Sequence, residues 1–290
     1  MTAGLRVEGL TKTYSGGVRA LAGVDLHVPS GMYGLLGPNG AGKSTLMRTL
    51  ATLQKPDAGT FSLDGIDGST DPDGLRRRLG YLPQQIGAYP GVTGRSLLRR
   101  FAALKGRTDR AERDREADRL LEQVNLSEAA GRQVSTYSGG MLRRFGIALA
   151  LLGQPRLLVV DEPTAGLDPA ERNRFHRVLA DVAADAVVLL STHIVEDVEN
   201  LCSRLSVMDQ GTIVAEGTPE ELRAPLRGQL WTTVIPRQGD LPEDVLRMTA
   251  APGGTRVVVH APACPDSSFE AHAPRLEDVY YHALQSEQAA

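Results

Sequence analysis

The run GPNGAGKS at residues 37–44 limits the possible folds more than any other feature of this sequence. It follows a short apolar segment, Met32 to Leu36, and precedes a helical pattern of apolar residues that includes Leu46 and Leu50. A strand, a glycine-rich loop and a helix in this order form a phosphate-binding loop in α/β proteins. The loop consists of Gly37, Pro38, Asn39, Gly40, Ala41, Gly42, Lys43 and Ser44. The sequence therefore predicts an α/β domain that binds phosphate at the end of a strand.

The residue types of this loop suit a nucleotide with its metal ion. Glycines let backbone N–H groups point at phosphate oxygens, and the helix that follows adds about half a positive charge at its N-terminus. Lys43 supplies a full charge, worth about 4 kcal/mol per unit charge at 4 Å in a partly shielded site. Ser44 is placed to ligate Mg²⁺.

A second apolar run, Leu157 to Val160, ends in Asp161 and Glu162. Ligands of open parallel sheets bind at the carboxyl ends of the strands. Asp161 is the expected Mg²⁺ ligand, and Glu162 can polarise the water that attacks a γ-phosphate. Alone, such a strand end is more often a loop cap or a solvent-exposed pair; together with the phosphate loop it predicts catalysis.

The alternation of apolar runs with helical patterns predicts a mostly parallel sheet flanked by helices, a P-loop NTPase core with an antiparallel β edge. Arg-, Ala- and Leu-rich sequence from Ala88 to Leu126 indicates an inserted helical subdomain, which we expect at about 88–150. Thr218, with Pro219 and Glu221, marks a helix start near the end of a main domain that we place at 1–225.

Residues 226–290 are predicted to form a small C-terminal α+β accessory domain. The expected elements are a strand at Leu230 to Ile235, a capped helix from Asp240 through Pro242 and Glu243 onward, a strand at Thr255 to His260, and a helix from Leu276.

A third motif identifies a family. The run is Tyr137-Ser138-Gly139-Gly140-Met141-Leu142-Arg143-Arg144, followed by apolar helical sequence. It resembles the signature motif of ATP-binding cassette ATPases, with Tyr137 where leucine is usual and Met141 where glutamine is usual. With these two residues the motif is similar to the signature motifs of drug-export cassettes. Ser138, Gly139 and Gly140, which would contact phosphate, are retained.

The resemblance implies how two copies work together. Ser138, Gly139 and the following helix N-terminus would form a second anion-binding surface, which one ATP cannot readily contact together with the phosphate loop of the same chain. In the family the two surfaces meet across a head-to-tail dimer, so we expect a second nucleotide-binding subunit, a homodimer in the simplest case.

The remaining site residues are also implied by the resemblance. Tyr14 would stack on adenine, and Thr45 would complete the phosphate loop. Gln84 would reach Mg²⁺ and water, with Gln85 as the alternative. Asp168, in Gly166-Leu167-Asp168, would lie in the loop that crosses the dimer interface. His193 would contact the γ-phosphate, although a lone tyrosine or histidine is more often a packing residue.

The family implies an ATP-hydrolysing subunit that powers a separate membrane permease. The ending Pro274 to Tyr280 resembles cassette subunits of drug- and antibiotic-resistance exporters, and we expect the permease contact at Ile86 to Leu104. The alternatives are a soluble cassette ATPase acting on nucleic acid or ribosomes, and a regulatory cassette without turnover. A net charge of -3 argues against nucleic acid as a partner.

The sequence predicts attachment to a membrane surface. Met1 to Gly9 has neither the basic run nor the apolar core of a signal peptide. The longest apolar stretch, Phe145 to Val160, is interrupted by polar residues and falls short of the roughly 20 residues that a bilayer span requires. We therefore expect a peripheral protein, held at the cytoplasmic face of the membrane by its permease.

Overall fold

Six strands form the central sheet of the computed structural model, which describes residues 4–87, 89–163, 168–242 and 244–288. Their order is β10-β9-β3-β8-β7-β6, and every neighbouring pair is parallel except β9 with β10. The strands are β3 (Gly31–Leu36), β6 (Leu79–Leu82), β7 (Leu157–Asp161), β8 (Val187–Thr192), β9 (Arg204–Asp209) and β10 (Thr212–Gly217). The predicted mostly parallel core is confirmed.

The central sheet is buried on both faces because its strands are apolar at consecutive positions. In β7, Leu157 and Val159 belong to one buried cluster, whereas Leu158 and Val160 belong to another. Helix α1 (Lys43–Leu50) packs in the first cluster and α5 (Gly139–Ala150) in the second. The phosphate-loop helix and the signature helix therefore lie on opposite faces of the sheet.

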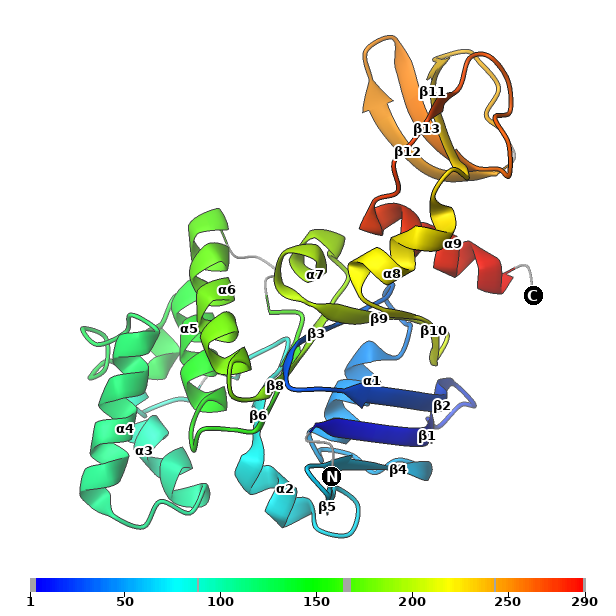
Figure 1. Cartoon of the computed structure of the whole chain (residues 1–290). Helices are drawn as coiled ribbons and strands as arrows, with labels where there is room; N and C mark the ends of the chain where they lie inside the picture. The colour runs from blue at the N-terminus through cyan, green and yellow to red at the C-terminus, as the bar shows by residue number, and fades with distance from the viewer. Residues whose placement is uncertain (1–3, 88, 164–167, 243, 289–290) are drawn as a thin grey trace.

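An antiparallel sheet of four strands covers α1 and supplies the predicted antiparallel part of the fold (Figure 1). Its order is β2-β1-β4-β5. The strands are β1 (Leu5–Thr13), β2 (Arg19–Val28), β4 (Ala58–Leu63) and β5 (Ile66–Asp67), and the short helix α2 (Pro72–Arg78) leads from this sheet to β6.

Helices fill the described part of the connection from β6 to β7, as the sequence predicts. They are α3 (Gly94–Leu104), α4 (Arg110–Gln123) and α5, with a short 3₁₀ turn at Val134–Thr136. Each α-helix starts at a side-chain cap, which explains where the helices begin: Thr93, Asp109 and Ser138 each accept a hydrogen bond from the N–H three residues later. Helices α6 (Pro169–Ala183) and α7 (Val195–Leu201) follow β7 and β8.

The C-terminal segment forms a separate antiparallel sheet of order β12-β13-β11-β14. It follows α8 (Pro219–Arg223), whose capping box joins Thr218 and Glu221 as predicted. The strands are β11 (Leu230–Pro236), β12 (Val245–Ala251), β13 (Gly254–His260) and β14 (Glu270–Ala271), and the last helix is α9 (Leu276–Gln288). Figure 1 shows this sheet projecting from the main body, with α9 at its base beside α8.

The predicted helix after Asp240 is wrong, because the described residues of this segment form strand β12. The chain turns back at Gly253, where φ is 85°, so that Val245 pairs with Val259 and Ala251 with Gly254. Pairing along β13 satisfies the backbone and buries Leu246, whereas a helix of this length would be marginal. Glu243 lies outside the described residues.

Helix α9 belongs to the same apolar cluster as α5 and the second face of the central sheet, through Leu276, Val279 and Tyr280. It also contacts α7, α8, β9 and β10. The division of the chain at residue 225 stays a prediction. Within the described ranges, no helix has the length and hydrophobicity needed to span a bilayer.

Candidate functional site

The phosphate loop requires glycine at three positions, for two physical reasons. A Cβ on Gly37 would lie 2.3 Å from the carbonyl oxygen of Met208, and one on Gly42 would lie 2.3 Å from that of Ala20. Gly40 has a φ of 88°, in the left-handed region. Helix α1 begins after Gly42 without a side-chain cap. Its first N–H groups are therefore available to an anion.

Lys43 lies inside this loop with only 5% of its surface exposed. Its Nζ donates hydrogen bonds to the carbonyl oxygens of Gly37 at 2.7 Å and Pro38 at 2.9 Å, and Glu162 Oε1 lies 3.9 Å away. Burial lowers the pKa of Lys43, while the charges of Glu162 and Asp161 act in the opposite direction. A buried ammonium in a loop of N–H groups fits a phosphate group.

Asp161 ends β7 and is almost completely buried. Its Oδ1 accepts hydrogen bonds from Ser191 Oγ at 3.1 Å and Ser44 Oγ at 3.4 Å. Burial nevertheless raises the pKa of this carboxyl group above its usual range. A cation placed beside Asp161 and Ser44 would remove the cost of the buried negative charge.

Glu162 is the point at which four elements meet. Its Oε2 accepts a hydrogen bond from Gln84 Nε2 at 3.1 Å, and its Oε1 lies 3.2 Å from His193 Nδ1. Gln84 follows β6, His193 follows β8, and Lys43 begins α1. The structure thus brings together the predicted residues of four separate motifs, and Gln84 rather than Gln85 supplies the amide.

Tyr14 lies beside the first turn of α1. Its hydroxyl donates to Gln54 Oε1 at 3.0 Å and lies 3.3 Å from Thr45 Oγ1, and 38% of its surface is exposed. The ring is therefore accessible next to the phosphate loop.

Ser138 and Gly139 of the signature are exposed, and their helix α5 packs on the opposite face of the sheet from α1. Ser138 Oγ caps α5 by accepting a hydrogen bond from the N–H of Met141 at 3.2 Å. A Cβ on Gly139 would meet open space, so this face of the helix N-terminus is accessible. Asp168 caps α6 through the N–H of Glu171 at 2.8 Å. Gly166 and Leu167 lie outside the described residues.

Two residues of the site were not assigned a role from the sequence. Ser191 donates to Asp161 through its hydroxyl and accepts a hydrogen bond from the N–H of Glu162 at 2.9 Å. Arg143 places a buried guanidinium behind the cluster. A polar residue near the end of the strand beside β7 could have indicated Ser191; an arginine within an apolar helix could have indicated Arg143.

Comparison with known proteins decides the family. The profile of the ABC transporter family matches residues 21–165. The chain belongs to the ABC transporter family. The cassette is 43% identical over 227 residues to the daunorubicin/doxorubicin resistance ATP-binding protein DrrA of Streptomyces peucetius, covering 78% of this chain and 68% of that protein. It is 39% identical over 277 residues to DrrA2 of Streptomyces coeruleorubidus, a daunorubicin resistance ATP-binding protein, covering 95% of this chain and 84% of that one.

Solved structures of other cassettes share this fold. An ATP-binding subunit of an ABC transporter superimposes with a TM-score of 0.70 at 30% identity, covering 77% of this chain and 93% of that one. A dimeric cassette in a post-hydrolysis state, bound to ADP and Pi, gives a TM-score of 0.68 at 26% identity, covering 74% of this chain and 98% of that one. The P-loop fold is confirmed, and the ABC protein described here is an ATP-binding ATPase.

Proposed function

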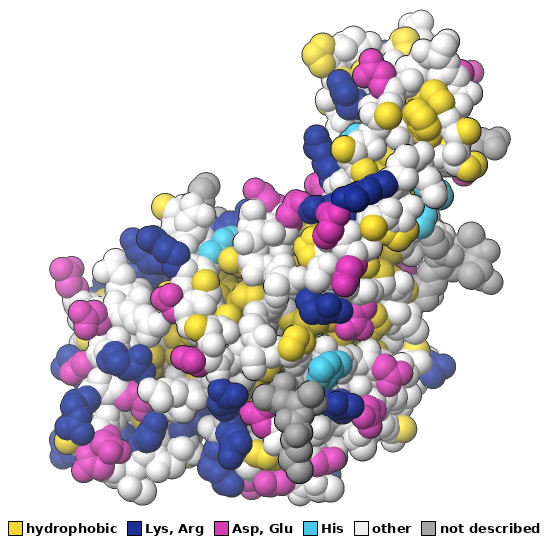
Figure 2. Space-filling model, viewed as in Figure 1, with side chains coloured by type: hydrophobic (Ala, Val, Ile, Leu, Met, Phe, Trp, Pro, Cys, Tyr) yellow, Lys and Arg dark blue, Asp and Glu magenta, His cyan; other side chains and the backbone are white. Residues whose placement is uncertain are grey.

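We propose that this ATPase powers a separate membrane permease that exports drugs or other small molecules. The support is the similarity to ATP-binding proteins named for resistance to daunorubicin and doxorubicin, together with the C-terminal segment at Pro274 to Tyr280. The alternative, a cassette that acts on nucleic acid or ribosomes, is not favoured. On the face shown in Figure 2, basic and acidic side chains lie intermixed, without the broad basic surface that nucleic acid requires.

The convergence of Lys43, Gln84 and His193 on Glu162 carries the mechanistic part of the proposal. The phosphate loop and Lys43 would hold the phosphates of ATP, and Tyr14 would stack on the adenine. Glu162 would accept a proton from the water that attacks the γ-phosphate, while His193 and Gln84 orient the carboxylate and the water.

The donor atoms beside the phosphate loop fit Mg²⁺. Ser44, Asp161 and Gln84 offer a hydroxyl, a carboxylate and an amide oxygen, the hard oxygen ligands that Mg²⁺ prefers. Among the described residues no group of three His, Cys, Asp or Glu side chains forms a metal site of its own. This agrees with an ion that is bound through one carboxylate and the phosphates of its nucleotide. When bound, Mg²⁺ would neutralise phosphate charge.

A head-to-tail pair of cassettes would complete each site. The phosphate loop and the signature residues Ser138, Gly139 and Gly140 are offered by helices on opposite faces of one sheet. A second copy can bring its signature motif to the ATP bound by the first, with Asp168 near the contact.

The permease would dock in a groove of about 660 Å³ beside the segment from Ile86 to Leu104. Ile86, Tyr89, Phe101 and Leu104 line it, and Leu104 is 80% exposed. The groove also contains Pro83, next to Gln84, so motion near the γ-phosphate has a short path to the permease. The cassette would then lie at the cytoplasmic face of the membrane. Cross-linking from a cysteine at position 104 should capture the permease; capture only from other surfaces would contradict this docking site.

Glu162→Gln tests the catalytic proposal. The variant should bind ATP normally but lose about 10²- to 10⁴-fold in turnover, the usual scale for a general base. Phosphate release and ATP binding are measured in parallel. The control Glu199→Gln neutralises a carboxylate that pairs with Arg223 instead, and should behave as wild type. Near-normal turnover of Glu162→Gln would remove Glu162 from this role.

A further inference from the structure

Arg143 makes an unusual set of contacts one turn into the signature helix. Its side chain is buried, with 8% of the residue exposed, and all three guanidinium nitrogens donate to backbone carbonyl oxygens. The acceptors are Pro163 (2.8 Å), Pro83 (2.9 Å), Gln84 (2.7 Å), Asp161 (3.4 Å) and Glu162. A guanidinium has five N–H groups, so these five acceptors match its full capacity.

These carbonyls come from two loops that are far apart in sequence. Pro83 and Gln84 follow β6, whereas Asp161, Glu162 and Pro163 lie at the end of β7. Among the described residues no carboxylate accepts a hydrogen bond from Arg143, so backbone dipoles replace a direct ion pair, while the charges of Asp161 and Glu162 also stabilise the guanidinium. Burial lowers the pKa of Arg143 accordingly. These hydrogen bonds to backbone carbonyls fix the distance between the two loops.

The backbone of Glu162 needs such support. Its φ is 45°, a left-handed conformation that costs a non-glycine residue about 1–3 kcal/mol. The N–H of Glu162 donates to Ser191 O at 2.9 Å, and its carbonyl accepts from Arg143. Both backbone polar groups are therefore held, which fixes the direction of the side chain toward Gln84 and His193.

We propose that Arg143 is a positioning residue that holds Glu162 and Gln84 at their working separation and attaches both to the signature helix. The inference rests on the proposed role of Glu162 as the catalytic base. Lysine cannot replace Arg143, because three donors on one nitrogen cannot reach carbonyls on two loops in the same way. Because Ser138 begins the same helix, the nucleotide-contacting end of α5 is joined rigidly to the catalytic carboxylate of its own chain.

A double-mutant cycle tests the proposal in the full-length chain. Arg143→Lys and Arg143→Gln are each made in the wild-type and Glu162→Gln backgrounds, and kcat and KM for ATP are measured by phosphate release. In the wild-type background we expect kcat to fall about 10- to 100-fold, the cost of a small misplacement of a catalytic group, with KM changed less than about twofold. In the Glu162→Gln background the same changes should lower kcat less than about threefold, since they act through the missing carboxylate.

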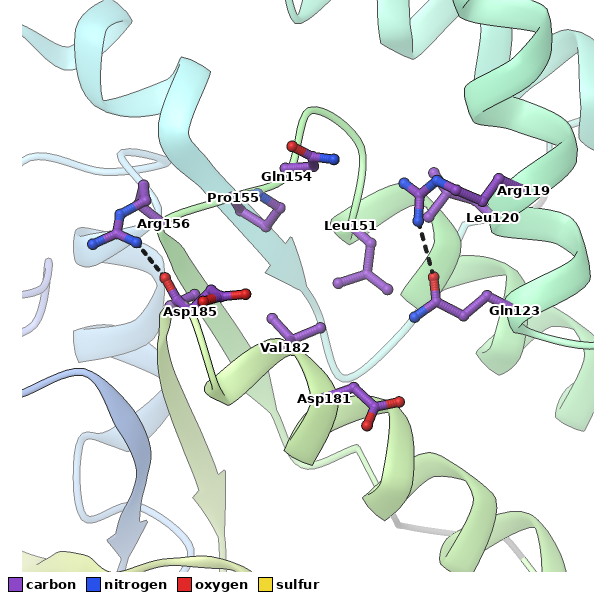
Figure 3. A pocket seen from close by; sticks show the side chains of 11 residues that line it. Arg119, Leu120, Gln123, Leu151, Gln154, Pro155, Arg156, Asp181, Val182 and Asp185 are labelled. Atoms are coloured by element: carbon purple, nitrogen blue, oxygen red, sulfur yellow. Dashed lines mark hydrogen bonds between the residues drawn. The ribbon is translucent and has the colours of Figure 1, made fainter.

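Arg156→Lys is the matched control. Arg156 also donates to a carbonyl oxygen, but it lies at the opposite end of β7 from Asp161. It precedes β7 and donates to Asp185 O beside a cavity of about 440 Å³ (Figure 3). This variant should retain wild-type kcat. Thermal midpoints of all variants show whether the fold is kept.

Three outcomes overturn the inference. They are equal losses of kcat in both backgrounds, an unchanged kcat in the wild-type background with or without a rise of KM, and failure of both Arg143 variants to fold, which would assign the residue to structure alone. Turnover retained by Glu162→Gln itself would instead contradict the proposed catalytic base, so the two failures are distinguishable.

Discussion

At the scale of single residues, the site combines charges that the protein stabilises poorly without a ligand. Asp161 and Lys43 are both buried. Burial raises the pKa of Asp161 and lowers the pKa of Lys43, so it favours the neutral form of each side chain. A site that binds an anion together with a cation can use both charges, since each ion would find its counter-charge already in place.

Asp161→Asn should therefore stabilise the protein in the absence of nucleotide. Because burial raises the folded pKa of Asp161, the folded chain binds its proton more tightly than the unfolded chain, and stability falls as pH rises from the ordinary value of 3.8 through the raised one. Asparagine removes this loss and keeps an oxygen for Ser191. We expect the thermal midpoint at pH 7 to rise about 2–4 °C, corresponding to about 1 kcal/mol.

Scanning calorimetry across pH measures this effect. The gain should shrink as the pH approaches 3.8, and Mg²⁺ with ATP should no longer stabilise the variant. Asp185→Asn, an exposed carboxylate, serves as the control. A lower midpoint for Asp161→Asn at pH 7 would contradict the account.

The residues of the site were predictable where a motif names a side chain, and not where the contact is made by the backbone. Lys43, Asp161, Glu162 and His193 lie in recognisable strings, and the structure brings Glu162 together with Lys43 and His193. The acceptors of Arg143 are carbonyl oxygens, which every residue possesses. Nothing in the sequence marks them.

At the scale of elements, each N-cap has a local effect on stability, but only one is proposed to contact nucleotide. Ser138→Ala should cost about 1 kcal/mol through loss of the cap of α5, and Asp109→Ala a similar amount at α4. Only Ser138→Ala should also lower the ATPase rate. Denaturant unfolding and phosphate release measure the two effects; equal rates for both variants would exclude Ser138 from the site.

Strand β12 shows why element prediction failed in one place. Asp240 and Pro242 are good helix-start residues, but they are local signals, whereas the strand is stabilised by pairing with β13 and by Arg247. Arg247 Nε donates to Asp278 Oδ1 at 3.1 Å in α9. Contacts of this kind join segments about 30 residues apart, and they leave no periodic pattern in the sequence of either segment.

We expect the loss of Asp278, a buried residue of α9, to destabilise this C-terminal sheet more than the loss of an exposed neighbour. Asp278 is completely buried and also accepts from His272 Nε2 at 2.9 Å and from the N–H of Arg275 at 2.8 Å. Asp278→Ala should cost about 3 kcal/mol or more, because it removes the completely buried partner of Arg247 and leaves that guanidinium with the exposed Glu277 as its ion-pair partner. The neighbouring Glu277→Ala, which removes the exposed carboxylate that pairs with the same Arg247, should cost about 0.5 kcal/mol or less.

Fluorescence of the single tryptophan, Trp231 in β11, reports unfolding of this sheet directly. Equal stability of the Asp278→Ala and Glu277→Ala variants would show that the buried carboxylate does not hold α9 to the sheet.

At the scale of the whole molecule, the central sheet separates the two surfaces that we propose to contact nucleotide. The phosphate loop belongs to the face of α1 and the signature motif to the face of α5. The head-to-tail pair that we propose rests on this separation, because one chain cannot readily present both surfaces to one ATP. Parallel-sheet topology and both motifs were predictable from sequence; the packing of α9 onto the body of the cassette was not, since it depends on the three-dimensional position of α7 and α8.

Mixing two defective variants tests the head-to-tail pair most directly. Lys43→Ala lacks the phosphate-loop charge and Ser138→Ala lacks the signature hydroxyl, so every homodimer has two defective sites. A mixed dimer contains one site with both defects and one intact site. With independent sites, an equal mixture should recover roughly a quarter of wild-type ATPase activity. Activity equal to the average of the two separate variants would contradict the account.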